Sequence, residues 1–205
     1  MERLILASNS PRRKEILEKF NYKFDIIASN YEEETLENIE NENIINTLVI
    51  DNCYRKAKTV ANKIASQAIV IGADTVVTLD SVCVLKPQNF NEAFLFLKRL
   101  SGREHTVKTA ISLVGVGFEQ NFELSEIFKT RVSFRELHDE EILEYIEKFQ
   151  PLDKAGAYGI QDFITCEQSK DPPPESFINK IEGSYYNVMG ICPFALQEML
   201  NKLNF

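Results

Sequence analysis

Two adjacent arginines near the N-terminus follow a helix-start signal. Ser10 suits the residue before a helix and Pro11 suits its first position, so Arg12 and Arg13 fall in the first turn. Cations are unfavourable there, because the helix dipole already places positive charge at that end. A bound anion reverses the sign, since free N–H groups and two guanidinium groups then converge on it. The spacing favours a phosphate site; the alternative is that both arginines turn into solvent or pair with Glu15.

Asp74 follows the continuous apolar run Ala68–Ala73, which has the length of a buried strand. Ligands of open α/β sheets bind beyond the carboxyl ends of strands, so a carboxylate placed there would point into a site. Aspartate is also a common first residue of a turn, and both interpretations stay open.

Lys56 lies within the apolar face of a helix expected from about Ile44 to Ala65. It therefore faces inward and needs an anion, unless its head reaches solvent from the border of that face. Arg55 falls on the opposite face, where Asp51, four residues earlier, is the expected ion-pair partner.

Three more charged residues are weaker candidates. Lys86 precedes Pro87 at the end of an expected hairpin, and Lys154 lies in the small-residue turn Asp153–Gly159. Small residues let a ligand approach the backbone, although an ordinary loop has the same composition. Glu33 lies in an acidic run, for which a solvated face is the default expectation.

Several familiar phosphate and metal motifs are absent from the sequence: the Gly-x-x-x-x-Gly-Lys loop, Gly-x-Gly-x-x-Gly, Gly-x-Ser-x-Gly and His-Glu-x-x-His. His105 and His138 are the only histidines, so a multi-histidine metal site is impossible, and we expect His138 at the surface. Any metal must use carboxylates, which favours Mg²⁺ or Mn²⁺ bound jointly with substrate phosphates.

The composition limits the class of protein. The 205 residues are 44% hydrophobic, enough for a core without metal or disulfide support, and their net charge of −8 repels polyanions. A nucleic-acid binder is disfavoured, and a small anionic substrate needs a local concentration of cations. No apolar run is long enough for a signal peptide or a membrane span, so we expect a soluble cytoplasmic protein. The cysteines form no Cys-x-x-Cys pair and are expected to be reduced and mostly buried: Cys53, Cys83, Cys166 and Cys192.

The elements that must carry these residues alternate between strands and helices. We expect strands at 4–7, 24–28, 68–73, 105–116 and 122–134, a hairpin at 76–85 turning at Asp80–Ser81, and helices at 44–65, 91–100, 139–149 and 194–203, with another through Ile16, Leu17 and Phe20. This order predicts an α/β fold: a mixed twisted sheet with flanking helices in a single domain, residues 1–205.

These pieces, in this order, resemble the Maf family of nucleotide pyrophosphatases. The matching stretches span nearly the whole chain: Leu6–Arg13, Gly72–Thr75, Lys86–Pro87, Leu100–Arg103 with His105, Asp153–Gln161, and Gly183–Val188. The resemblance implies an α/β fold related to the inosine triphosphate pyrophosphatases, with a cleft between two lobes. It also implies hydrolysis of a nucleoside triphosphate to the monophosphate and pyrophosphate, assisted by a divalent cation.

The resemblance further implies roles for individual residues. Asp74 matches the family's proton acceptor, and Glu33 and Asp74 match its metal-associated carboxylates. The phosphate-facing set matches Ser8, Arg12, Arg13, Lys56, Lys86 and Lys154, of which Lys56 and Lys86 would act in catalysis with Asp74. Arg13, Thr75 and Gln161 resemble the specificity positions of the branch that prefers dTTP and UTP over 7-methyl-GTP. The Gln161 amide offers both a donor and an acceptor to a pyrimidine edge.

The sequence departs from the family pattern at one place, and two other functions stay open. After Gln161 the family usually has a short glycine-containing turn, whereas here a longer loop from Asp162 to Ser176 borders the predicted base pocket. The expected partner is a small nucleoside triphosphate, modified pyrimidines included, rather than nucleic acid or membrane, with a homodimer as one option for assembly. The alternatives are a 7-methyl-GTP pyrophosphatase and a nucleotide-binding regulator of septum formation without significant turnover. Glu33 and Asp74 favour the enzyme, because acidic groups beside a triphosphate are useful only if they hold a metal.

Overall fold

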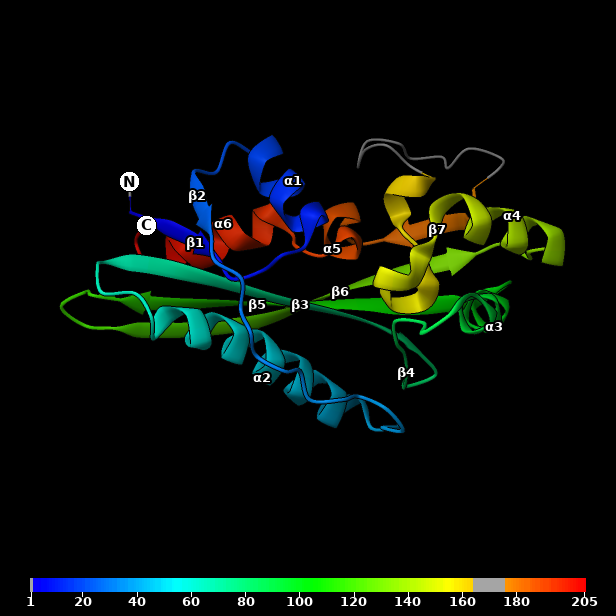
Figure 1. Cartoon of the computed structure of the whole chain (residues 1–205), viewed down its shortest axis with the longest axis horizontal. Helices are drawn as coiled ribbons and strands as arrows, with labels where there is room; N and C mark the ends of the chain where they lie inside the picture. The colour runs from blue at the N-terminus through cyan, green and yellow to red at the C-terminus, as the bar shows by residue number, and fades with distance from the viewer. Residues whose placement is uncertain (1, 164–175) are drawn as a thin grey trace.

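The strands of the chain form one mixed sheet. The computed structural model describes residues 2–163 and 176–205. Within them the strands are β1 (Leu4–Leu6), β2 (Phe24–Ile26), β3 (Ala68–Leu79), β4 (Val82–Val84), β5 (Glu104–Val116), β6 (Phe122–Phe134) and β7 (Ile178–Glu182). Their order across the sheet is β2-β1-β3-β5-β6-β7, with β4 also paired to β3 (Figure 1). β1 runs parallel to β2 and β3, and the other pairs are antiparallel.

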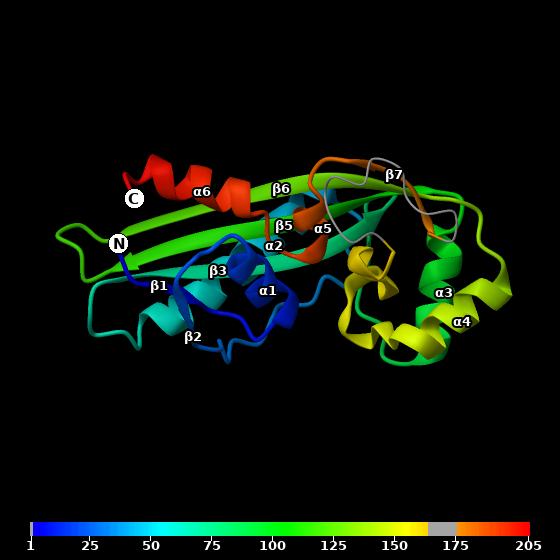
Figure 2. The ribbon, with the colours of Figure 1, turned by 90° about the horizontal axis from the view of Figure 1, so that it is seen from above.

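Helices cover both faces of this sheet. They are α1 (Pro11–Lys19), α2 (Glu42–Ala61), α3 (Phe90–Leu100), α4 (Asp139–Phe149), α5 (Tyr185–Met189) and α6 (Pro193–Lys202), with short 3₁₀ turns η1 (Pro151–Asp153), η2 (Ala155–Ala157) and η3 (Ile160–Asp162). α2 lies on one face, and α1, α5 and α6 lie on the other (Figures 1 and 2). α3, α4 and the 3₁₀ turns gather at one end. The predicted mixed sheet with flanking helices is confirmed.

The neighbours of β3 leave an opening in the sheet. On one side, β5 pairs with β3 from Ala68 to Thr78. On the other side, β1 pairs only with Ile69 and its neighbours up to Ile71, and β4 pairs only with Val77–Leu79. Among the described strands, none pairs with residues 72–76 on this side. β1 ends at Leu6, so the chain that follows it leaves the sheet beside this gap.

The expected end of the strand at Ala73 is wrong. β3 continues to Leu79, because its ladder with β5 runs on without interruption. Asp74 therefore lies in the middle of a strand. It is still accessible to a ligand, because the gap between β1 and β4 lies beside it.

Close packing of α2 on β3 depends on Gly72. A Cβ built there would lie 2.3 Å from the carbonyl oxygen of Cys53 and 3.0 Å from Cβ of Ala57. The absent side chain lets the α2 backbone approach the strand two residues before Asp74. The N-terminus of α2 is capped by Asn41, whose side chain accepts hydrogen bonds from the N–H groups of Asn43 and Ile44.

Other predictions are confirmed or corrected in detail. The hairpin turns at Asp80 and Ser81, whose φ values of 51° and 64° suit a two-residue hairpin loop. The long helix begins earlier than expected and ends at Ala61. The prediction missed β7, α5 and the 3₁₀ turns, which are too short for a periodic pattern to emerge.

Cys53, Cys83 and Cys192 are buried and free, whereas Cys166 and residues 164–175 of the longer loop lie outside the described residues. No described helix is long and apolar enough to span a membrane.

Candidate active site

The gap beside β3 opens into a cleft of about 370 Å³. The cleft is lined by every residue that the sequence singled out for a site: Ser8, Arg12, Arg13, Glu33, Lys56, Asp74, Thr75, Lys86, Lys154 and Gln161. They come from α1, α2, β3, and the segments that follow β1, β2, β4 and α4. The tertiary structure therefore brings the whole predicted set to one place.

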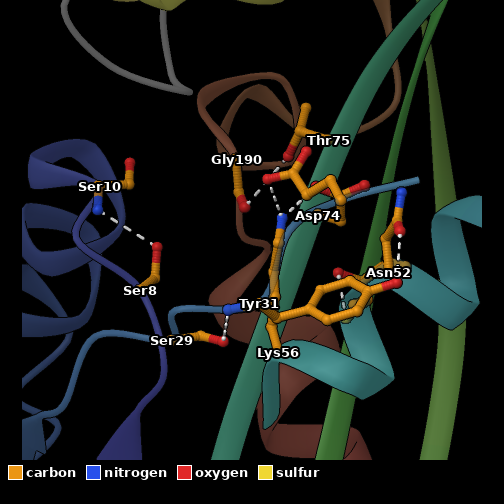
Figure 3. A network of polar contacts seen from close by, with 12 residues as sticks. Ser8, Ser10, Ser29, Tyr31, Asn52, Lys56, Asp74, Thr75 and Gly190 are labelled. Carbon is orange, nitrogen blue, oxygen red and sulfur yellow. Dashed lines mark hydrogen bonds and ion pairs between the residues drawn. The ribbon is translucent and has the colours of Figure 1, made fainter. Parts of the chain in front are cut away.

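Asp74 and Thr75 leave β3 on opposite faces, because successive side chains of a strand alternate. Asp74 contacts Lys56 of α2, whereas Thr75 donates to the carbonyl oxygen of Gly190 at the end of α5 (Figure 3). In the middle of a closed sheet these two side chains would be separated by the neighbouring strand. Here the gap lets both line the same cleft.

Lys56 joins two carboxylates. Its Nζ lies 2.6 Å from Oδ1 of Asp74 and 2.6 Å from Oε1 of Glu33. The Lys56 and Asp74 side chains are 11% and 7% exposed, while that of Glu33 is 44% exposed. Partial burial acts to raise the pKa of Glu33, but Lys56, with smaller contributions from Lys86 and Arg13, outweighs it, so the pKa lies below its ordinary value. The inward orientation predicted for Lys56 is confirmed.

Asn52 explains why Glu33 reaches Lys56. It lies one turn before Lys56 on the same face of α2 and is 1% exposed. Its Oδ1 accepts a hydrogen bond from Glu34 N at 2.9 Å, and its Nδ2 donates to Glu34 O at 3.0 Å. This two-bond contact ties the segment after β2 to the helix. The sequence does not predict this role of Asn52, because no spacing pattern links it to Glu34.

Arg13 turns into the cleft rather than into solvent. Its guanidinium donates to Gly190 O at 2.9 Å, Ser8 Oγ at 3.1 Å and Thr75 Oγ1 at 3.2 Å. Burial lowers the pKa of Arg13, although Asp74 acts in the opposite direction. Its three acceptors are neutral and it forms no ion pair among the described residues, so its charge is available to an anionic ligand.

Arg12 pairs with a residue that the sequence did not indicate as its partner. Its Nη1 lies 2.5 Å from Oδ2 of Asp153, which belongs to η1, while Glu15 is not involved. Ser10 does precede α1, as predicted, but its side chain makes no capping hydrogen bond. Instead, the N–H of Ser10 donates to Ser8 Oγ at 3.2 Å.

Two carboxylates of the cleft could hold a divalent cation. No group of three or more His, Cys, Asp or Glu side chains that could hold a metal occurs among the described residues. Glu33 and Asp74, however, share one ammonium group, so both carboxylates can face a single cation. Mg²⁺ typically binds one or two protein carboxylates and completes its shell with substrate phosphates and water. The two residues therefore fit a Mg²⁺ or Mn²⁺ ion that binds together with phosphates.

α5 contributes a support that the sequence did not reveal. The buried Asn187 donates to Val107 O at 3.2 Å, and its carbonyl oxygen accepts from Thr109 Oγ1 at 2.8 Å. These bonds hold α5 against β5. Gly190 follows the end of α5, and its carbonyl oxygen accepts the hydrogen bond from Arg13. Gly183–Val188 is one of the stretches that carry the resemblance to the Maf family, but its residue types alone indicate no chemical role.

The comparisons with known proteins agree on a family. The family model for Maf-like proteins matches residues 3–203. A protein of Alkaliphilus metalliredigens named dTTP/UTP pyrophosphatase is 43% identical over 202 residues, covering 98% of this chain and 96% of that protein. One of the same name from Clostridium beijerinckii is 39% identical over 203 residues, covering 99% and 96%. The chain belongs to the Maf family.

Solved structures show a more distant likeness. A nucleoside-triphosphatase, or dITP/XTP pyrophosphatase, of Mycobacterium abscessus superimposes with a TM-score of 0.42 at 16% identity, over 66% of this chain and 75% of that one.

Proposed function

We propose that this protein hydrolyses pyrimidine nucleoside triphosphates, dTTP and UTP in particular, to the monophosphate and pyrophosphate. The observation that carries the proposal is the Asp74–Lys56–Glu33 cluster, which lies at the gap in the sheet and faces the cleft. The relatives named dTTP/UTP pyrophosphatase, matched over nearly their full length, support the same substrate class.

The charges around the cleft suit a triphosphate. Five cations and three carboxylates line it among the described residues: Arg12, Arg13, Lys56, Lys86 and Lys154, with Glu33, Asp74 and Asp153. This local positive excess occurs in a chain whose net charge is −8. Lys86 forms no ion pair within the described part of the chain, so it can contact a phosphate directly.

In the proposed reaction, Asp74 accepts a proton from a water molecule that attacks the α-phosphorus. A new P–O bond forms to the water oxygen, and the bond between the α-phosphorus and the bridging oxygen breaks, which releases pyrophosphate. Lys56 holds the Asp74 carboxylate in place, while Arg12, Arg13, Lys86 and Lys154 neutralise the phosphates. Such positioning and charge stabilisation supply most of the catalysis in phosphoryl chemistry.

Glu33 and Asp74 would hold the divalent cation, Mg²⁺ or Mn²⁺. When bound, such an ion would neutralise phosphate charge and make the phosphorus more electrophilic.

Gln161 supports recognition of a pyrimidine base. Its Oε1 is buried without a hydrogen-bond partner among the described residues, and its Nε2 donates to Asp162 Oδ1 at 3.3 Å. Uracil and thymine carry a ring N–H that would satisfy the free acceptor. Guanine also carries a ring N–H, so 7-methyl-GTP is the second candidate substrate.

The Asp74→Asn variant tests the proposal. Asparagine has the same shape, and Lys56 keeps Glu33 as a partner, so we expect the variant to fold. Loss of the proton acceptor should reduce kcat by about 10² to 10⁴. The measurement is release of pyrophosphate and monophosphate from a panel of triphosphates with Mg²⁺. Wild-type rates in the variant would exclude Asp74 from the mechanism.

The same panel decides between the alternatives. Orthophosphate as the first product would place the cut at the terminal phosphate and contradict the proposed reaction. Tight binding without turnover of any triphosphate would favour the nucleotide-binding regulator. A preference for 7-methyl-GTP over UTP would contradict the pyrimidine assignment.

A further inference from the structure

Asp153 lies between two of the cations that line the cleft. Its Oδ2 is 2.5 Å from Nη1 of Arg12, and its Oδ1 is 2.9 Å from Nζ of Lys154. Arg12 comes from the first turn of α1, whereas Asp153 ends η1, 141 positions later in the chain. One carboxylate therefore spans two cations with one oxygen each, as two oxygens of a phosphate group would.

The exposure of these groups distinguishes them from the Lys56 cluster. The Asp153 side chain is 58% exposed, whereas Arg12 and Lys154 are 23% and 13% exposed. Exposed ion pairs are weak, because water competes with both partners. Asp153 can turn into solvent at little cost, while the buried Asp74 cannot leave Lys56 so readily.

The carboxylate is charged under ordinary conditions. Partial burial acts to raise the pKa of Asp153, but its hydrogen bonds to Lys154 and Arg12 outweigh burial, and the pKa lies below its ordinary value. A phosphate that binds Arg12 and Lys154 must therefore replace an existing anion rather than enter an empty cationic site.

We propose that Asp153 is a specificity-determining residue that competes with phosphate groups for Arg12 and Lys154. It weakens the binding of small phosphates and of pyrophosphate, whereas a triphosphate is long enough to reach Arg13 and Lys86 as well. The consequence is preference for the full triphosphate and easier release of the pyrophosphate product. This inference rests on the proposed function for its biological meaning.

The test measures binding of pyrophosphate and of inorganic phosphate by isothermal titration calorimetry, without metal. In Asp153→Asn, and in Asp153→Ser should the first variant fold poorly, we expect roughly three- to tenfold tighter binding of pyrophosphate. The matched control is Asp25→Asn, which removes a similarly exposed (56%) carboxylate from its pair with Arg3, outside the cleft. The control should bind pyrophosphate as the wild-type protein does.

Unchanged or weaker binding of pyrophosphate in Asp153→Asn would overturn the inference, as would an equal gain in the Asp25→Asn control. The calorimetric measurement needs no turnover, so it stands even if the proposed hydrolysis fails. A large fall in the single-turnover rate of UTP hydrolysis in Asp153→Asn, with unchanged pyrophosphate affinity, would assign Asp153 to the reaction itself and contradict its role as a competitor.

Discussion

At the scale of single residues, Lys56 links the groups that the proposed reaction needs. The proton acceptor and the second carboxylate both contact its Nζ at 2.6 Å. Without this ammonium group, two carboxylates would face one another in a partly buried site. Coulomb repulsion would then oppose holding both carboxylates in the positions that the proposed reaction needs.

We expect Lys56→Met to be less stable and almost inactive. Removing one partner of a buried ion pair leaves an uncompensated charge, which costs about 3 kcal/mol. Turnover of UTP should fall at least 100-fold, in line with the loss of one properly charged catalytic group. Urea denaturation gives the stability, and pyrophosphate release gives the activity.

A double variant separates the two effects. Lys56→Met combined with Asp74→Asn removes both buried charges, so it should recover part of the stability lost in the single variant while remaining inactive. No recovery of stability would mean that packing of the lysine stem, rather than its charge, accounts for the loss.

At the scale of elements, the contact between α2 and β3 sets the distance between Lys56 and Asp74. We expect Gly72→Ala to reduce stability by about 2 to 3 kcal/mol, because the new Cβ would meet the Cys53 carbonyl oxygen at 2.3 Å, and backbone cannot rotate away. Displacement of α2 should also move Lys56 and reduce kcat. Denaturation and UTP hydrolysis are the measurements.

Gly115→Ala is the matched control for this prediction. It lies on β5 in the same sheet, and its Cβ would meet the Phe122 ring at 2.2 Å, a side chain that can adjust. It should cost less stability and leave kcat unchanged. Equal losses of kcat in both variants would show that general destabilisation, not the position of α2, lowers the rate.

At the scale of the whole molecule, His105 ties folding stability to pH. It is 2% exposed, its Nε2 lies 2.8 Å from the Tyr158 hydroxyl, and burial lowers its pKa to about 3. In the unfolded chain the pKa is about 6.5. The neutral ring therefore stabilises the fold fully above about pH 6.5, and this contribution is lost as the pH falls from there towards 3.

We expect the free energy of unfolding to fall by about 2 kcal/mol between pH 7 and pH 5, through this residue. His105→Gln should be less stable at pH 7 but lose much less on acidification. His138→Gln, at an exposed position, should keep the wild-type difference. Urea denaturation at the two pH values measures it, and an undiminished difference in His105→Gln would contradict the assignment.

The sequence by itself predicted the candidate site residues, partly from local patterns and partly from the resemblance to the Maf family, which alone indicated Ser8, Thr75 and Gln161. Helical spacing directed Lys56 inward, the Ser10–Pro11 signal placed two arginines at a helix start, and the negative net charge required local clustering of cations. All ten site residues named from the sequence line one cleft. The predictions for Lys56, Arg12 and Arg13 need only local patterns, because periodicity and capping depend on near neighbours in the chain.

How the cleft forms, and how a ligand reaches Asp74, is visible only in the tertiary structure. The sequence indicated a strand that ends before Asp74, yet the strand continues, and access depends on β1 and β4 pairing with different halves of β3. The partner of Arg12 is Asp153, far away in the chain, and Gly190 receives Arg13. Strand order and contacts between distant segments are set by how all the elements pack together, and no local pattern encodes them.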